Sequence, residues 1–388
     1  MWHAGRMRVA VVAGPEAGHA VPALALCRKL IAAGDDPVVF TAGRWLDVAR
    51  DAGIATRKLG GLAPRATDDD SDSGAKIHGR AAHISTEILP DLRALNLDLV
   101  VSDVITVGGG MAAERLGLPW IELSPHPLYL PSKGLPPIGS GLAPGAGLRG
   151  RLRDTLLRAA TARSIRQGHA QRGAARVSVG LPAHDPGPVA RLIATLPALE
   201  VSRPDWPENA HVVGPLLWEP TETVLELPPG DGPLVMVAPS TASTGAGGLL
   251  EVAIQALDGT GVRMVASMFD APPDGLPGWV RAGFGRQDEM LRNASVLVCG
   301  AGHGLLAKGL IAGVPVVTVP GGGDQWELAN RAARLGSGLV VRPLGAQALR
   351  AAVRTVLGEP EFTAAARRAA DGSTQVEDPV EVCRAALR

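Results

Sequence analysis

The chain has 388 residues, 46% apolar and 20% charged, and its 38 basic and 38 acidic side chains give a formal net charge of zero. This length is enough for two globular domains, and the neutral charge provides no electrostatic argument for binding nucleic acid or an anionic membrane. Aromatic residues, at 3%, are too few for a base-stacking platform, and three dispersed cysteines (Cys27, Cys299, Cys383) exclude a disulfide framework or cysteine-rich zinc site and fit a reducing compartment.

The amino-terminal segment predicts a strand rather than a targeting signal. Its apolar run, Val9–Val12, is short and lacks a cleavage-type exit, and no window of the chain has the apolar length that a membrane span needs. Residues 1–6 add nothing to this strand, so either Met1 or Met7 can be the start of translation. We expect a cytoplasmic protein without stable membrane insertion.

The first half of the chain alternates between strand and helix signals. Repeated strand–helix–strand units imply a parallel sheet that helices cover on both faces. In chain order, we expect strands at Val9–Val12, Val38–Thr41, Leu97–Ser102 and Trp120–Leu123, and helices at Ala23–Ala33, Leu46–Ala52 and Gly110–Leu116.

Two long stretches interrupt this alternation. Ala66–Gly79 is rich in Asp, Ser and Gly and predicts a mobile loop. His126–Gly150 is dense in Pro and Gly, and an arginine-rich helical stretch follows it to about Gln171. Loops of this length inside a compact domain are usually functional, so we expect a role in ligand binding for them.

The second half repeats the α/β pattern after a proline-rich segment, Ser202–Pro229, which is typical of an interdomain linker. Two α/β domains with a cleft between them are the simplest arrangement. The tail is helical from Leu344 and is broken near Gly358–Pro360. The other expected elements are strands Leu234–Ala238, Arg263–Ser267, Ser295–Cys299 and Val314–Val319, with a helix at Leu249–Leu257.

Glycine turns follow two of these strands, within the segment Phe284–Gly338. Gly300, Gly302 and Gly304 come after the strand that ends at Cys299, and Gly321–Gly323 precedes Asp324 and Gln325 at a helix start. Such turns place backbone N–H groups at the carboxyl ends of strands, where α/β folds bind anionic ligands.

A further turn, Pro239–Gly245, contains Ser240 and Thr241 and suits a phosphate, although an ordinary flexible turn fits it nearly as well. The chain has no Walker lysine motif and no G-x-G-x-x-G after its first strand, which argues against P-loop and NAD-binding proteins. It also has no H-E-x-x-H pattern or clustered His and Cys, so we expect no metal.

His19 and Asp103 follow two strands of the first predicted sheet. A histidine in the loop after the first strand can take a proton from a hydroxyl, because its pKa is near neutral. A carboxylate beside it would orient the ring and stabilise the imidazolium. The alternatives stay open: His19 can simply support the start of a helix, and Asp103 can cap the helix at Gly110.

In their order and spacing, these segments resemble the inverting nucleotide-sugar glycosyltransferases of the GT-B fold, over nearly the whole chain. The branch with the greatest similarity is the UDP-glycosyltransferase-like family that modifies natural products. Five segments carry the resemblance: RVAVVAGPEAGHAVPALALCRKLIAAG, LDLVVSDVITVGGGMAAERLGLPWIELSP, NAHVVGPLLW, FGRQDEML and GVPVVTVPGGGDQWELANRAARLGSG.

The resemblance implies an α/β fold of GT-B architecture, with two Rossmann-like domains facing each other across a cleft. It implies an acceptor-binding domain at 1–205, a linker at 206–230 and a nucleotide-sugar-binding domain at 231–388, whose C-terminal helices can pack back on the first domain. It also implies a donor of UDP or dTDP type, a hydrophobic small-molecule acceptor under Ala66–Gly79 and His126–Gly150, and a monomer or homodimer.

The resemblance implies roles for individual residues as well. His19 would be the base and Asp103 its partner, while Asp324 and Gln325 would bind the donor sugar. Inversion would follow from direct attack on the anomeric carbon, with the diphosphate bound by backbone N–H groups rather than a metal. The residues implied for the nucleotide and diphosphate are Ser240, Thr241, Arg286, Gln287, Gly300, Gly302, His303, Gly304 and Lys308.

The diphosphate motif of this family, H-G-G-x-G-T-x-x-E, departs from its usual form here. Gly300 stands in place of the histidine, Leu305 in place of the hydroxyl residue, and Lys308 in place of the glutamate that binds the ribose diol. His303 can substitute for the histidine, and Lys308 can meet a phosphate or simply face solvent. The chain is therefore either an active transferase with an unusual donor or a catalytically silent binding or partner module.

Overall fold

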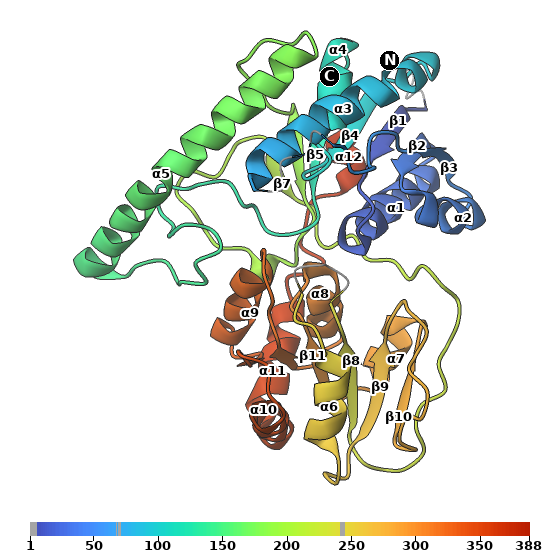
Figure 1. The fold of residues 1–388 in the computed structure, drawn as a ribbon, viewed down its shortest axis with the longest axis vertical. Helices are drawn as coiled ribbons and strands as arrows, with labels where there is room; N and C mark the ends of the chain where they lie inside the picture. Colours follow the sequence, from blue (N-terminus) through green and yellow to red (C-terminus); the bar gives the residue numbers. More distant parts are fainter. Residues whose placement is uncertain (1–5, 67, 69–70, 241–244) are drawn as a thin grey trace.

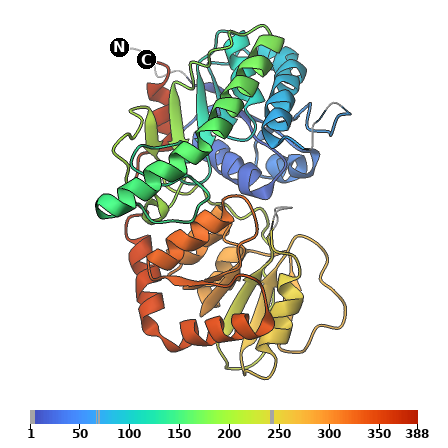
Figure 2. The same ribbon diagram turned by 60° about the vertical axis from the view of Figure 1, so that its left-hand side comes forward.

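The computed structural model describes residues 6–66, 68, 71–240 and 245–388, and within these residues the chain forms two parallel sheets. The first has seven strands in the order β3-β2-β1-β4-β5-β6-β7, and the second has six in the order β10-β9-β8-β11-β12-β13. Figures 1 and 2 show each sheet within its own layer of helices, one body above the other. The predicted α/β class and the two-body architecture are therefore confirmed.

The first body contains the following elements. They are strands β1 (Arg8–Val12), β2 (Asp36–Thr41), β3 (Ala55–Lys58), β4 (Leu99–Asp103), β5 (Trp120–Ser124), β6 (Ala190–Ile193) and β7 (Ala210–Val212), helices α1 (Ala17–Ala32), α2 (Gly43–Asp51), α3 (Ser73–Ala94), α4 (Gly108–Arg115) and α5 (Gly147–Ser178), and the 3₁₀ turn Pro197–Leu199.

The second sheet and the remaining helices follow. They are strands β8 (Leu234–Ala238), β9 (Arg263–Ser267), β10 (Val280–Gly283), β11 (Val296–Cys299), β12 (Val316–Thr318) and β13 (Gly338–Val340), and helices α6 (Leu249–Leu257), α7 (Gln287–Asn293), α8 (His303–Ile311), α9 (Gln325–Arg334), α10 (Ala346–Gly358), α11 (Pro360–Ala370) and α12 (Pro379–Ala385).

Strand β1 shows why these apolar runs become buried strands. Val9 and Val11 pack into one core cluster, with α1 and α12, whereas Ala10 and Val12 pack into another, with α3 and α4. Successive side chains point to opposite faces of a sheet, so both faces of β1 are covered and a continuous apolar run is required. The same arrangement places the carboxyl ends of β1 and β4 side by side, because the two strands pair directly.

Two predictions about this body differ most from the structure in their bounds. Helix α1 begins at Ala17 rather than Ala23, so His19 lies in its first turn and not in a loop. Helix α3 includes the second half of the predicted loop Ala66–Gly79. It forms there because Asp72 caps it by accepting from the Ala75 N–H, and because Ile84, on its inner face, is buried in the core.

Strand β7 lies within residues 206–230, which we predicted as a linker, and it extends the first sheet by pairing with β6. The chain returns at its end, where Val380 and Cys383 of α12 join the core of the first body. The red helix α12 accordingly lies in the upper body of Figure 1, beside the first sheet. The domain limits at 205 and 231 stay a prediction.

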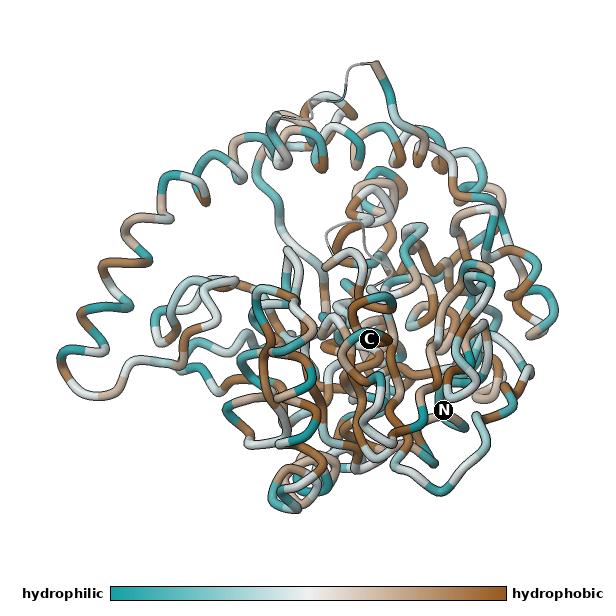
Figure 3. Tube along the Cα trace, turned by 60° about the horizontal axis from the view of Figure 1, so that its bottom comes forward, coloured by the Kyte–Doolittle hydropathy of each residue, from teal (hydrophilic) through white to brown (hydrophobic). Residues whose placement is uncertain are grey.

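Helix α5 extends beyond the rest of the first body, as Figure 2 shows. Its first half exposes Leu148, Leu152 and Leu156 among arginines, and Figure 3 shows hydrophilic and hydrophobic residues alternating along it. The Pro- and Gly-rich stretch before it runs from β5 to the second body. Across the portion of the chain that the structure describes, no helix combines the length and apolarity needed to cross a membrane.

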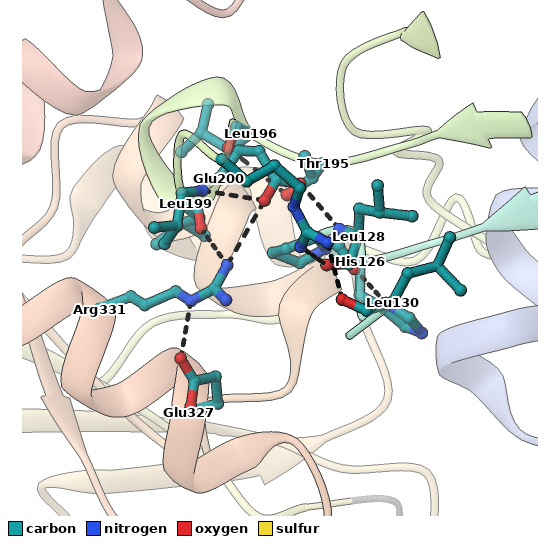
Figure 4. A network of polar contacts seen from close by, with 12 residues as sticks. His126, Leu128, Leu130, Thr195, Leu196, Leu199, Glu200, Glu327 and Arg331 are labelled. Carbon is teal, nitrogen blue, oxygen red and sulfur yellow. Dashed lines mark hydrogen bonds and ion pairs between the residues drawn. The ribbon is translucent and has the colours of Figure 1, made fainter. Parts of the chain in front are cut away.

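Polar contacts join helix α9 to two segments of the first body: the Pro- and Gly-rich stretch before α5 and the segment after β6. Arg331 donates to the Leu199 carbonyl (2.8 Å) and to Glu327 (3.1 Å), as Figure 4 shows. Glu327 in turn accepts from the Gly141 N–H at 2.9 Å, and Arg334 donates to the Gly141 carbonyl at 2.7 Å. Helix α9 is therefore held against the first body.

Candidate functional site

The His19 and Asp103 side chains meet at the carboxyl edge of the first sheet. His19 Nδ1 lies 2.7 Å from Asp103 Oδ2, and the exposed fractions of the two side chains are 19% and 0%. The second Asp103 oxygen accepts from the Ile105 N–H at 3.0 Å. Because a carboxylate can only accept, we assign the ring proton of neutral His19 to Nδ1, which donates to Asp103. The other ring nitrogen, Nε2, is then free to accept a proton.

This arrangement bears on the alternatives that the sequence left open. Asp103 does not cap α4, because the residue at the cap position is Val107, without a side-chain hydrogen bond. His19 belongs to the first turn of α1, but its ring is directed to Asp103 and lines a cavity between the two bodies. The pair thus has the geometry of a base and its orienting group.

The charge of Asp103 controls the pKa of His19. Burial lowers the pKa of His19, but the Asp103 charge and the hydrogen bond outweigh it, with smaller contributions from Glu16 and Asp324. The pKa of His19 therefore lies above its ordinary value of about 6.5. A raised pKa means that the imidazolium formed by taking a proton is stabilised.

A second histidine, His126, borders the same cavity and was missed from the sequence. Its ring centroid lies 6.3 Å from that of His19, with the two rings nearly perpendicular, and the His126 ring stacks on that of Tyr129 at a centroid distance of 4.4 Å. Burial lowers the pKa of His126, although its hydrogen bond with the Pro127 carbonyl and the Asp324 charge act in the opposite direction. Its place just after β5, the strand next to β4, is the signal that could have found it.

Gln325 and Asp324 line the cavity from the start of α9. Gln325 is nearly fully buried; its Oε1 accepts from the Gly321 N–H and its Nε2 donates to Ser240 Oγ, both at 2.9 Å. Asp324 precedes the helix, and its carboxylate makes no capping bond. The Asp324 charge reaches His19, His126 and Tyr129, which places it on the same cavity.

The glycine turn after β11 leads into helix α8 at the centre of the cavity. Gly302 is the N-cap of α8, and the first intrahelical bond there is donated by Leu306 to the Gly302 carbonyl. The N–H groups of His303, Gly304 and Leu305 thus have no partner within the helix. A Cβ at Gly302 or Gly304 would meet nothing within 4 Å, so the backbone is open to the cavity. Helix N-termini of this kind bind anions.

The His303 side chain, which we expected at the diphosphate, is bonded to the first body. Its Nε2 accepts from the Leu196 N–H at 3.3 Å and lies 3.0 Å from Thr195 Oγ1, and the ring also bonds the Pro125 carbonyl. Burial lowers its pKa to about 3, with a smaller effect of His126. The backbone N–H of His303, at the first position of α8, has no partner within the helix.

Gln287 and Arg286, which we expected together at the nucleotide, line two different pockets. Gln287 lines the cavity and donates to Ser267 Oγ at 3.1 Å. The Arg286 side chain pairs with Asp288 and Glu222 and lines a neighbouring pocket instead. Thr241, predicted with Ser240 at the phosphate, lies outside the described residues.

Lys308 is neither exposed nor free. Its Nζ donates to Glu219 Oε1 at 2.6 Å, to Gln287 Oε1 at 3.0 Å and to the Trp218 carbonyl at 3.3 Å. Glu219 comes from the segment between the two sheets, and nothing in the sequence pattern singled it out. The interpretation of Lys308 as a solvent-facing residue was therefore wrong.

Together, these features place a histidine–carboxylate pair and a helix N-terminus on one cavity between the two bodies of a two-sheet α/β protein. Comparison with known proteins then specifies the class. Residues 254–387 match the family model described as "Erythromycin biosynthesis protein CIII-like, C-terminal domain".

Among curated proteins, 4'-demethylrebeccamycin synthase of Lentzea aerocolonigenes is 30% identical, covering 94% of this chain and 95% of its own. Among solved structures, the glycotransferase of kitacinnamycin has a TM-score of 0.75 at 21% identity, covering 99% of this chain and 100% of that one. The spinosyn rhamnosyltransferase SpnG complexed with thymidine diphosphate has a TM-score of 0.70 at 20% identity, covering 98% and 100%.

The chain belongs to the GT-B glycosyltransferases of natural-product biosynthesis. The predicted family and enzyme class are thus confirmed. Among the residues that the structure describes, no group of three or more His, Cys, Asp or Glu could hold a metal ion.

Proposed function

We propose that the chain transfers a hexose, with inversion and without a metal, from a UDP- or dTDP-type nucleotide sugar to a hydroxyl of a hydrophobic small molecule. The observation that carries this proposal is the 2.7 Å bond between His19 and Asp103, in a cavity that also contains the start of α8. Base and anion site are the two parts that such a transfer needs.

His19 acts as the base in this mechanism. Its Nε2 takes the proton of the acceptor hydroxyl while the oxygen attacks the anomeric carbon and the bond to the diphosphate breaks. Asp103 holds the ring and balances the imidazolium, which the raised pKa of His19 supports. A single displacement of this kind inverts the anomeric carbon, because the nucleophile enters opposite the leaving group.

The leaving diphosphate is stabilised by the N-terminus of α8. The N–H groups of Gly304 and Leu305 and the helix dipole supply the positive field that a metal would otherwise provide. Asp324 and Gln325 accept and donate hydrogen bonds to the donor sugar, between the diphosphate and His19. The His303 contribution is limited to its backbone N–H, since its ring is bonded to Thr195 and Leu196.

The acceptor lies on the first body, beside His126 and Tyr129. These stacked rings offer an apolar surface next to His19, and the stretch 126–150 continues it. The names of the relatives, which include a rebeccamycin-related synthase and a spinosyn rhamnosyltransferase, support a natural product as the acceptor.

A catalytically silent binding module is the second candidate. It is favoured by positions 300 and 305: Gly300 has no side chain and that of Leu305 is apolar, so neither side chain donates a hydrogen bond to a diphosphate. Such charge-assisted bonds are worth about 1.5–3 kcal/mol each, so their loss weakens donor binding. The buried His19–Asp103 pair favours the active enzyme, because a silent protein has no use for it.

Calorimetric titration with UDP and dTDP tests the proposal. We expect at least one of them to bind, and His19→Ala to abolish transfer while leaving that nucleotide's affinity nearly unchanged. If neither UDP nor dTDP binds, the proposed transfer from a UDP- or dTDP-type donor is refuted. Unchanged turnover in His19→Ala would remove His19 from its role as the base.

A further inference from the structure

The cavity has a polar wall, formed by Glu219, Gln287 and Lys308, that the proposed mechanism leaves without a role. Lys308 lies five residues after His303 on α8, about 7 Å further along the helix axis. Glu219 and Lys308 also border the neighbouring pocket, which does not include His19. The wall is therefore on the side of the α8 N-terminus that is remote from the reacting end.

Lys308 has no hydrogen-bonding capacity left for a ligand. An ammonium group has three N–H bonds, and those of Lys308 are used by Glu219, Gln287 and the Trp218 carbonyl. The Lys308 and Glu219 side chains are only 11% and 10% exposed. The lysine charge is thus balanced within the protein, and Lys308 serves to fix Glu219.

Glu219, by contrast, keeps acceptor capacity that faces the cavity. Its Oε1 accepts from Lys308 and its Oε2 accepts from the Gln287 N–H at 3.0 Å. A carboxylate has about four acceptor positions, so about two remain. A partly buried carboxylate with unfilled acceptor positions is complementary to a hydroxyl group of a ligand.

We propose that Glu219 accepts a hydrogen bond from the 3′-hydroxyl of the donor's nucleoside, and that Lys308 positions its carboxylate. This inference rests on the proposed function. With the hexose beside His19 and the diphosphate at the start of α8, the linear donor places its nucleoside beyond that helix start, against Glu219. The 3′-hydroxyl is common to uridine and thymidine nucleotides, so the contact suits either donor.

The wall explains how a lysine is accommodated at position 308. Lys308 stands where the family motif has a glutamate. This part of the cavity still has a carboxylate, because Glu219, 89 residues earlier in the chain, supplies one from the segment between the sheets. The pair acts as a unit, and Lys308 without Glu219 would be a buried charge that keeps two neutral acceptors but no opposite charge.

The test compares one nucleoside diphosphate, whichever of UDP and dTDP binds more tightly, with its 3′-deoxy analogue. Dissociation constants are measured calorimetrically for the wild type and Glu219→Gln. We expect Glu219→Gln to weaken the normal nucleotide about 10- to 100-fold and the 3′-deoxy analogue much less. Removal of the 3′-hydroxyl should likewise matter in the wild type and little in the variant.

Equal weakening of both nucleotides would overturn the inference, since Glu219 would then be only structural. Glu222→Gln is the matched control: its side chain is 89% exposed and pairs with Arg286, and it should change neither constant. If Glu219→Gln does not fold, the double variant Glu219→Gln/Lys308→Gln removes both charges. The dissociation constants of the nucleotide and its 3′-deoxy analogue are then compared between the wild type and this variant.

The failure of this inference is distinguishable from the failure of the proposed function. If the wild type binds neither UDP nor dTDP, both fail together. If the nucleotide binds and the wild type transfers sugar, but the 3′-hydroxyl and Glu219 contribute independently, only the role of Glu219 is lost.

Discussion

Replacing Asp103 by asparagine should disable His19 as a base while keeping a side chain of the same size beside it. The carboxamide has nearly the same shape, but its N–H group donates to His19 Nδ1, which moves the ring proton to Nε2. The nitrogen that faces the cavity then cannot accept a proton. The charge that stabilises the imidazolium is lost in the same substitution.

The expected magnitude follows from the geometry. The two groups are 2.7 Å apart at their closest atoms, and the Asp103 side chain is fully buried. Two charges about 4 Å apart in an effective dielectric constant of about 20 interact by about 4 kcal/mol. That corresponds to about a 10³-fold loss of kcat, since each 1.4 kcal/mol is a factor of ten.

The pH dependence gives a second readout. Wild-type activity requires neutral His19, so it should rise with pH through the raised pKa of His19. Without Asp103, burial lowers that pKa, and the inflection in Asp103→Asn should move to lower pH. For stability the sign is opposite: the protonated pair stabilises the fold below a pH of about 6.5, and this is lost as the pH rises through the raised pKa of His19.

The assay is release of the nucleoside diphosphate from the donor, measured with an acceptor between pH 5 and 9. Asp35→Asn is the matched control, because Asp35 is also a buried carboxylate of the first body but bonds the Met7 N–H and Arg384. It should lower stability and leave the inflection in place. An unchanged inflection in Asp103→Asn, or turnover near that of the wild type, would refute the reasoning.

Two further predictions concern contacts between the bodies. Glu327→Gln weakens the bonds to Gly141 and Arg331, so it should lower the unfolding free energy by about 1–3 kcal/mol. It should also raise the KM for the acceptor more than the KM for the donor, because Gly141 belongs to the stretch 126–150 beside the proposed acceptor site. The control Glu251→Gln, at an exposed position, should change neither the unfolding free energy nor either KM. A change confined to the donor KM would contradict a role of the stretch 126–150 in acceptor binding. His303 has a pKa of about 3 in the fold and about 6.5 unfolded, so stability falls on acidification below pH 6.5. Urea unfolding at pH 7.5, 5.5 and 4.5 should show a shallower fall in His303→Gln, and an equal fall would mean that the fold does not lower the pKa of His303.

The strands and helices with the strongest apolar patterns were predictable almost to the residue. Leu234–Ala238, Leu249–Leu257 and Arg263–Ser267 have the same bounds in sequence and structure. Each is an apolar run or an amphipathic period bounded by turn residues, and that information is local. The fold class follows from their alternation, because β-α-β units impose a parallel sheet.

Helix α3 shows where local signals fail. Its first turns contain Gly74 and Gly79 and follow an Asp-rich stretch, which indicates a loop. The helix forms because Ile84 and Ile88 are buried against the sheet and because Asp72 also accepts from Gln171 of α5. Burial against a distant element outweighed the weak helix propensity of its start.

The site divides in the same way. His19, Asp103, Asp324 and Gln325 could be placed from the sequence, because each follows or precedes a recognisable strand, and strand ends share one edge of a parallel sheet. The partners of His303 and Lys308 could not, since Thr195 and Glu219 lie 108 and 89 residues away in the chain. Only packing of the two bodies decides such contacts, because they depend on which surfaces meet and not on periodicity along the chain. The sequence alone therefore determined the fold class and the histidine–carboxylate pair, whereas the tertiary structure decided that His303 joins the two bodies and that Lys308 is paired with Glu219.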